Sequence, residues 1–341
     1  MSVSLDSKYI IDGVPRDLTP AEILAGVSGK APSPAQGTVV DETIDPGLGP
    51  LLLDPSKTDE YLEAVAAAPG RRLSVPFAGP CTRGRIAETL IDSMLRAGNF
   101  KLDDLSLTAK WSCNPDKVGD MAAFYASVEA AADYIDTLGV SLRRYGCETG
   151  GFDARFATPF SGAPAIVPGT FDPDPESWIV YVPFDTSDYR LGGSLLSQAV
   201  APDWGIAPQI DDPDYFMDCF EVLREFAEDG ILVSARAVGA GGLANAARLM
   251  SSAGVGAGID ISDVLRAKGE TDPVRILFSE IPGALFQIRD SDFDYIDAEM
   301  LLQDIAFYPL GHPSGEGLRL RSGAASGIQN ILESLINYGQ S

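Results

Sequence analysis

The chain has 341 residues, of which 49 are acidic and 25 are basic, so its formal net charge is −24. Nucleic acids and anionic membranes bind through positive surfaces, and this charge argues against both as partners. No apolar run approaches the roughly 18 residues of a membrane span, the N-terminus has no signal-peptide pattern, and we expect a cytoplasmic protein.

Residues 1–50 are rich in Pro, Gly, Ser and Asp, with short apolar islands such as Tyr9–Ile11. This composition predicts an irregular arm draped over the body of the protein. The spacing of apolar residues then predicts alternating helices and strands. We expect helices at 61–68, 82–97 and 117–138, and strands at 71–76, 104–111, 140–145 and 163–167.

A segment of alternating Pro and Asp at 169–177 predicts a linker, which divides the chain into lobes at 51–171 and 172–341. In the second lobe we expect helices at 192–200, 214–229, 243–252, 292–303 and 324–338. The expected strands are 178–184, 231–235, 258–261, 274–278, 284–288, 305–308 and 318–320. No repeat of 20–50 residues is evident, so the pattern indicates two α/β lobes.

The segment between the strand at 231–235 and the helix at 243–252 carries Gly239, Gly241 and Gly242. Unpaired N–H groups at a helix start can bind phosphate, and glycines permit sharp turns and close ligand approach. The loop holds no acid, lysine or histidine. The pattern therefore indicates a nucleotide-binding turn without reactive side chains.

Glu88 and Asp92 lie four residues apart on a predicted helix, so both carboxylates project from one face. Oxygen ligands at this spacing suit Mg²⁺, which often bridges protein acids to phosphates. The alternative is a pair of solvated acids beside Arg85 and Arg96.

Glu148 and Thr149 follow a predicted strand within a glycine-rich loop, where catalytic groups tend to lie; a plain glycine turn is the alternative. Lys110, Arg143 and Arg144 are candidate contacts for a phosphorylated substrate, or ordinary surface bases.

Four cysteines are scattered without a Cys-x-x-Cys motif, and we expect reduced thiols. Cys147 has no nearby histidine, so a nucleophilic role is not indicated. His312 is the only histidine, which excludes a multi-histidine metal site, and its turn-forming neighbours predict a solvated loop.

Several segments in order resemble the AIR synthetase-like superfamily, and above all the C-terminal synthetase half of formylglycinamide ribonucleotide amidotransferase (FGAM synthase). The likeness extends over roughly residues 50 to 322. The segments that carry it are 85–92, 107–111, 119–128, 138–140, 189–198, 240–243, 254–260 and 277–280.

The resemblance implies an α+β, two-lobed fold with an N-terminal βα lobe and a C-terminal α/β lobe. The N-terminal lobe would form a shared β-barrel on dimerisation, or with another half of the same type. Active members bind ATP and Mg²⁺ and convert an amide to an amidine in purine biosynthesis. A glutaminase subunit is a further implied partner.

The resemblance assigns Glu88 to a metal-binding Glu of the family and Asp92 to a metal-binding Asn. It also aligns the family's His-Asp-x-Ser-Asp-Gly-Gly with Arg236–Gly242, which replaces His by Arg236 and both acids by Ala237 and Ala240. Losing these acids removes charge compensation during phosphoryl transfer. The chain is therefore expected to be either an FGAM synthase-like ligase subunit with degenerate motifs or a non-catalytic half-module that pairs with an active homologue.

Overall fold

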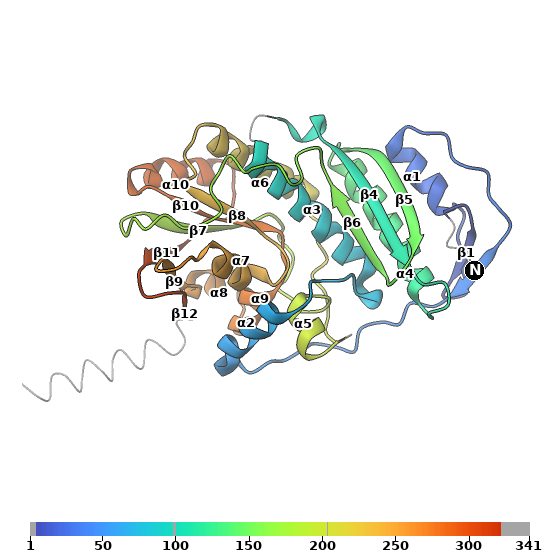
Figure 1. Cartoon of the computed structure of the whole chain (residues 1–341), viewed down its shortest axis with the longest axis horizontal. Coiled ribbons are helices and arrows are strands. Elements are labelled where there is room, and N and C mark those ends of the chain that lie inside the picture. The colour runs from blue at the N-terminus through green and yellow to red at the C-terminus, as the bar shows by residue number, and fades with distance from the viewer. Residues whose placement is uncertain (1–4, 98–99, 203, 322–341) are drawn as a thin grey trace, which may run out of the picture.

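The computed structural model describes residues 5–97, 100–202 and 204–321, and shows two lobes with helix α3 between their sheets (Figure 1). The N-terminal lobe contains two three-stranded sheets, ordered β2-β1-β3 and β5-β4-β6. The C-terminal lobe contains a six-stranded sheet ordered β12-β9-β11-β7-β10-β8. The prediction of a two-lobed α+β fold is confirmed.

The central strand of the second sheet is β4 (Ser106–Cys113), which pairs in parallel with β5 (Ser141–Thr149) and antiparallel with β6 (Asp153–Ala157). Alternate residues of β4, from Leu107 to Cys113, are buried, while Thr108 and Lys110 are exposed. This period of two leaves one sheet face open to solvent. Helices α3 (Ala78–Ala97) and α4 (Asp120–Thr137) pack against each other in this lobe.

The prediction of an irregular arm is wrong for much of residues 8–42. Strands β1 (Lys8–Ile11), β2 (Val14–Pro15) and β3 (Val39–Glu42) form a sheet, and α1 (Pro20–Ser28) packs on α4 and β5. Tyr9 is buried against Phe124 and Tyr125, and the Glu42 carboxylate accepts hydrogen bonds from two N–H groups at the start of α4. β1 pairs with β2 across a short turn, but its parallel partner β3 lies about thirty residues away, so local composition could not indicate that second pairing.

The C-terminal sheet is antiparallel except where β12 runs parallel to β9. Its strands are β7 (Trp178–Pro183), β8 (Ser234–Val238), β9 (Gly256–Asp260), β10 (Gly283–Ile288), β11 (Tyr308–Ser314) and β12 (Arg319–Arg321). The helices of this lobe are α5 (Leu195–Val200), α6 (Pro213–Glu228), α7 (Gly242–Met250), α8 (Ser262–Lys268), α9 (Pro273–Phe278) and α10 (Phe293–Leu302). Helix α2 (Thr58–Ala67), from earlier in the chain, packs on α5 and α7.

Three predicted strands are wrong. Residues 71–76 and 163–167 form no strand, and residues 274–278 belong to helix α9. Short apolar runs do not distinguish strands from buried helices, whereas Asp272, which caps α9, and Pro273 at its first position are helix-start signals. His312 lies in β11 rather than in a loop, half-buried against Trp178. The predicted helix at 324–338 lies outside the described residues.

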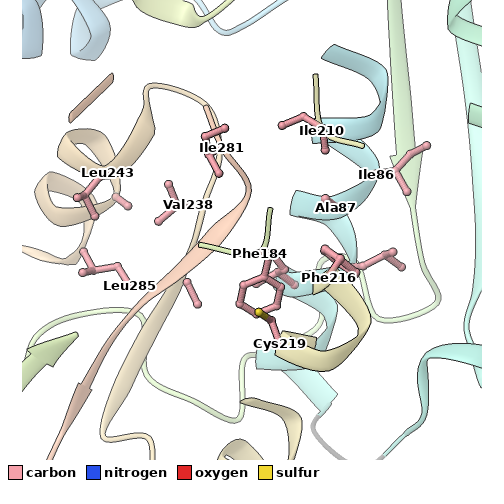
Figure 2. Close-up of a cluster of buried hydrophobic side chains, with 14 of the residues drawn as sticks. Ile86, Ala87, Phe184, Ile210, Phe216, Cys219, Val238, Leu243, Ile281 and Leu285 are labelled. Carbon is pink, nitrogen blue, oxygen red and sulfur yellow. The ribbon is translucent and has the colours of Figure 1, made fainter. Parts of the chain in front are cut away.

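Buried side chains join the two lobes into a continuous core. Figure 2 shows Ile86 and Ala87 of α3 in one cluster with Phe216 and Cys219 of α6 and with side chains of the C-terminal lobe, including Val238 of β8. Because α3 is packed on both sides, its polar face is held at a fixed place beside β8. This packing positions Glu88 and Asp92.

Candidate functional site

The glycine corner, residues 239–242, connects the end of β8 to the start of α7. Gly241 and Gly242 have φ values of +80° and +68°, a backbone conformation that side chains with a Cβ rarely adopt. A Cβ on Gly242 would also lie 2.7 Å from the carbonyl oxygens of Leu277 and Ser279. The glycines therefore serve the turn and its close packing, and Gly239 leaves a space in which the Glu88 carboxylate lies.

Two carboxylates accept the N–H groups of this corner. The Ala240 N–H donates to Glu88 Oε1 at 3.4 Å, and the Gly241 N–H donates to Glu280 Oε1 at 2.7 Å. Glu280 Oε1 also accepts the N–H of Leu195, at the start of α5, at 2.7 Å. Two N–H groups of the corner thus bond carboxylates of the protein itself, and the binding of a nucleotide phosphate there stays a prediction.

Arg71 bridges the two carboxylates. Its guanidinium donates to Glu88 Oε2 at 2.8 Å and to Glu280. The side chains of Arg71 and Glu280 are each 7 % exposed, and that of Glu88 is 32 % exposed. Burial alone would lower the pKa of Arg71, because it disfavours the charged guanidinium. The Glu280 and Glu88 carboxylates together have a larger, opposite effect, so the pKa of Arg71 is raised. We call Arg71, Glu88 and Glu280 the carboxylate cluster.

Sequence reasoning missed Arg71 and Glu280. Glu280 lies in one of the segments that carry the family resemblance. Nothing in the sequence around it indicates that it pairs with Arg71. Arg71 precedes a segment that forms no regular element and lies more than 200 positions from Glu280. Only the folded chain brings them together.

The two candidate metal ligands are each paired with an arginine. Asp92 lies one helical turn from Glu88 and accepts from Arg96 Nε at 2.7 Å, while Glu88 is held by Arg71 and the corner. Among the residues that the structure describes, no three His, Cys, Asp or Glu side chains form a metal-binding group. In this arrangement the donor set does not fit a Mg²⁺ ion, because both carboxylates are already neutralised.

Glu148 and Thr149 lie at the end of β5, and the structure brings Glu148 to Lys110 rather than to the glycine corner. The Glu148 carboxylate and the Lys110 ammonium are 2.7 Å apart, and both side chains are more than half exposed. An exposed pair of this kind contributes little to stability.

A cavity of about 680 Å³ borders the carboxylate cluster at Arg71. It is lined by the C-terminal end of α2, by Asp153 and Arg155, and by α5. Gln198 of α5 is part of this lining, and its side-chain amide accepts from the N–H of Arg72 and donates to the Arg72 carbonyl. A volume of this size can hold a nucleotide-sized ligand. The cavity lies between elements from both halves of the chain.

The C-terminal lobe matches a known family: residues 181–294 match "AIR synthase related protein, C-terminal domain". Phosphoribosylformylglycinamidine synthase of Homo sapiens is 23 % identical over 276 residues, which cover 76 % of this chain and 20 % of the human protein.

Solved structures show the same fold. The Thermotoga maritima PurL complexed with FGAR superposes with a TM-score of 0.56 at 15 % identity, covering 74 % of this chain and 42 % of that one. The same protein complexed with AMPPCP gives a TM-score of 0.50 at 15 % identity, with coverage of 79 % and 46 %. PurLQS from Thermotoga maritima gives 0.52 at 15 % identity, with coverage of 78 % and 46 %.

The C-terminal lobe thus carries an AIR synthase related domain, and the fold of about three quarters of the chain is that of PurL. The chain is similar to phosphoribosylformylglycinamidine synthase and spans about a fifth of the length of the human protein. The expectation drawn from the family motifs is therefore confirmed for the fold and for the C-terminal domain. The shared β-barrel, the site residues and the domain limits stay predictions.

Proposed function

We propose that this chain is a phosphoribosylformylglycinamidine synthase-like subunit of purine biosynthesis. The observation that carries the proposal is the position of Glu88, which α3 holds against the glycine corner at the junction of two lobes with the family's fold. The T. maritima relative is described in complexes with FGAR and with AMPPCP. We extend both ligand classes to the cavity beside Arg71.

The residues that line the cavity and the glycine corner determine which groups of such a ligand could bind. Arg71 and Arg72 line the cavity and favour anionic groups, while the carboxylate cluster keeps the corner N–H groups occupied. A phosphate could use these N–H groups only after displacing Glu88 or Glu280. Because the acids present do not fit Mg²⁺ in this arrangement, no catalytic step is assigned to a metal here.

The test is an assay with FGAR, ATP and ammonia, which removes the need for a glutaminase subunit, together with calorimetric titration of ATP and Mg²⁺. The proposal predicts ATP binding at submillimolar concentration, and amidine formation that is reduced by Glu88→Ala. Glu63→Ala on α2 is a control for the loss of an acid elsewhere. Absence of ATP binding at millimolar concentration would overturn the ligase assignment.

A second candidate is a non-catalytic half-module that pairs with an active homologue or with a second copy of this chain. It is favoured by the self-occupied corner, where carboxylates take the N–H groups that a phosphate would need. The similar T. maritima structure of PurLQS is consistent with assembly of such a module with other subunits. Under this candidate Glu88→Ala leaves the activity of the assembled complex unchanged.

The partners we propose are a homodimer or another AIR synthetase-like half, with a glutaminase subunit in the complete assembly, in the cytoplasm. The open face of the β5-β4-β6 sheet is the surface from which a shared barrel would form. Among the described residues, every helix is too short or too polar to serve as a membrane span.

A further inference from the structure

A cavity of about 500 Å³ lies between the N-terminal segment of the chain and helix α4. It is lined by residues 14–18, by Ile23 of α1 and by the part of α4 between residues 125 and 133. We call it the Arg16 cavity. Strand β1 and helix α1 lie at the end of the molecule away from the C-terminal sheet (Figure 1), so this cavity is separate from the carboxylate cluster. Its size is sufficient for a small molecule.

The side chain of Arg16 is held in place at this cavity but has no polar partner. Its Cζ lies 5.7 Å from the centroid of the Tyr125 ring. The Tyr125 hydroxyl donates to the Leu18 carbonyl at 3.0 Å, which fixes the ring against the N-terminal segment. Within the described part of the chain, the Arg16 guanidinium forms no hydrogen bond or ion pair, and its Nε is buried. A buried donor without an acceptor costs free energy, and an acceptor on a ligand would remove that cost.

Glu129 is a second charged group of the cavity without a partner. It lies one turn of α4 after Tyr125, on the same face of the helix, and it is half-buried. Burial raises the pKa of its carboxyl, and the positive charge of Arg16 opposes this shift. Among the described residues, no cation forms an ion pair with Glu129. Arg16 and Glu129 therefore line one cavity without forming an ion pair with each other, and a ligand can contact both.

The N-terminal segment also contributes apolar side chains to the cavity. Val14 is 56 % exposed and Leu18 is 50 % exposed, and the half-buried Ile23 lines the same space. Exposed apolar side chains that meet in a cavity favour an apolar group on the ligand, because its binding removes them from water.

The remaining charges of the cavity show which ligands it disfavours. Asp17 and Asp133 also line it, and both are exposed; the Asp133 carboxylate lies 3.8 Å from the Arg83 guanidinium. Together with Glu129, three acids accompany the one arginine that lines the cavity. A ligand that is only an anion would be repelled by these acids, so the ligand needs a positive group in addition to the acceptor that Arg16 lacks.

We propose that the Arg16 cavity binds a free α-amino acid with an apolar side chain. Arg16 donates to its carboxylate, as a guanidinium does in paired hydrogen bonds, and Glu129 accepts from its ammonium group. The side chain of the amino acid lies against Val14, Leu18 and Ile23. Such a ligand carries both charges and the apolar group that the cavity leaves without partners. The site does not rest on the proposed synthase activity.

The test is performed on the full-length protein without ATP and without divalent metal. Leucine and phenylalanine are titrated separately, by calorimetry and by saturation-transfer NMR. We expect at least one of them to bind at millimolar concentration or below, and at least a tenfold loss of affinity in Arg16→Met and in Glu129→Gln. Two analogues of leucine, isoamylamine without the carboxylate and 4-methylpentanoate without the ammonium group, should each bind at least tenfold more weakly than leucine.

Two control variants separate this site from a general effect of charge. Arg266→Met removes an exposed arginine paired with Asp263, and Asp136→Asn removes an exposed carboxylate from α4. Both should leave the affinity unchanged. If Arg16→Met does not fold, Glu129→Gln, which preserves the shape of the side chain, provides the comparison.

Three results would overturn the proposal. The first is that neither leucine nor phenylalanine binds at millimolar concentration. The second is that Arg16→Met and Glu129→Gln both bind like the unmodified protein. The third is that either analogue binds as tightly as leucine, because one of the two charged groups would then be unnecessary.

Discussion

Replacing Arg71 by Met tests whether the carboxylate cluster holds the two lobes together at the glycine corner. Methionine preserves much of the side-chain volume but removes the guanidinium that contacts Glu88 and Glu280. Glu280 would remain in a site where its side chain is 7 % exposed, with two backbone N–H donors and no cation. The expected result is a large loss of stability without a change in fold.

The magnitude follows from the burial of each partner. Removing one member of a buried ion pair costs about 3–5 kcal/mol, because the remaining charge is desolvated and uncompensated. The Glu88 side chain is 32 % exposed, so water can hydrate its carboxylate once the guanidinium is gone. Glu88 therefore adds little to the loss of stability. With an unfolding entropy of roughly 2.1 cal/mol/K per residue over the 341 residues, the loss corresponds to a Tm lower by about 4–7 °C.

The assay is urea denaturation followed by tryptophan fluorescence and by circular dichroism, with Tm measured by calorimetry. The double variant Arg71→Met, Glu280→Gln should recover at least half of the loss, because an amide oxygen can still accept from Gly241 and Leu195 without carrying a charge. Arg72→Met, on the exposed neighbouring residue, should cost less than about 0.5 kcal/mol. A single-variant loss below about 1 kcal/mol, or a double variant no more stable than the single one, would refute the reasoning.

Three further predictions concern α1, the glycine corner and a thiol. Thr19→Ala removes the side-chain cap of α1 and should lower the unfolding free energy by about 1 kcal/mol in urea titrations. Gly239→Ala should cost about 1–3 kcal/mol, because its Cβ needs the space of the Glu88 carboxylate, whereas Gly146→Ala, with no atom in the way, should cost much less. Burial raises the pKa of the Cys81 thiol to about 11. The folded state therefore keeps this proton more tightly, and stability should fall as pH rises from 9 to 11, less so in Cys81→Ala; equal pH profiles would contradict this.

The sequence predicts most of the regular elements because their signals are local. The helix at 82–97 and the strand at 104–111 follow from apolar spacing, and the structure extends or shifts each by only a few residues. The glycine corner is also predicted correctly as a turn between a strand and a helix. Its glycines and the apolar runs on either side are sufficient to define it.

Some of the errors arise where a partner is distant in the chain. The first sheet depends on β1 meeting β3, and the corner depends on Glu280 and Arg71, which lie far apart in sequence. Patterns of hydropathy contain no information on such pairing. The α1 capping box is a different case, because Thr19 and Glu22 are three residues apart and satisfy each other's N–H groups. That signal is local and could have indicated the start of α1, which our prediction of an irregular arm missed.

The carboxylate cluster sets a condition on any catalytic role of this chain. For Glu88 to bind a metal, it must leave Arg71 and the Ala240 N–H, which leaves Arg71 with Glu280 alone. If Glu280 moved away from the corner, the N–H groups of Gly241 and Leu195 would each need another acceptor. A phosphate is the ligand that could compensate both changes at once, because it accepts from the freed N–H groups and from Arg71. A nucleotide and a metal at this corner must therefore bind together, so Mg²⁺ titrated without nucleotide should give no heat above that of Glu88→Ala.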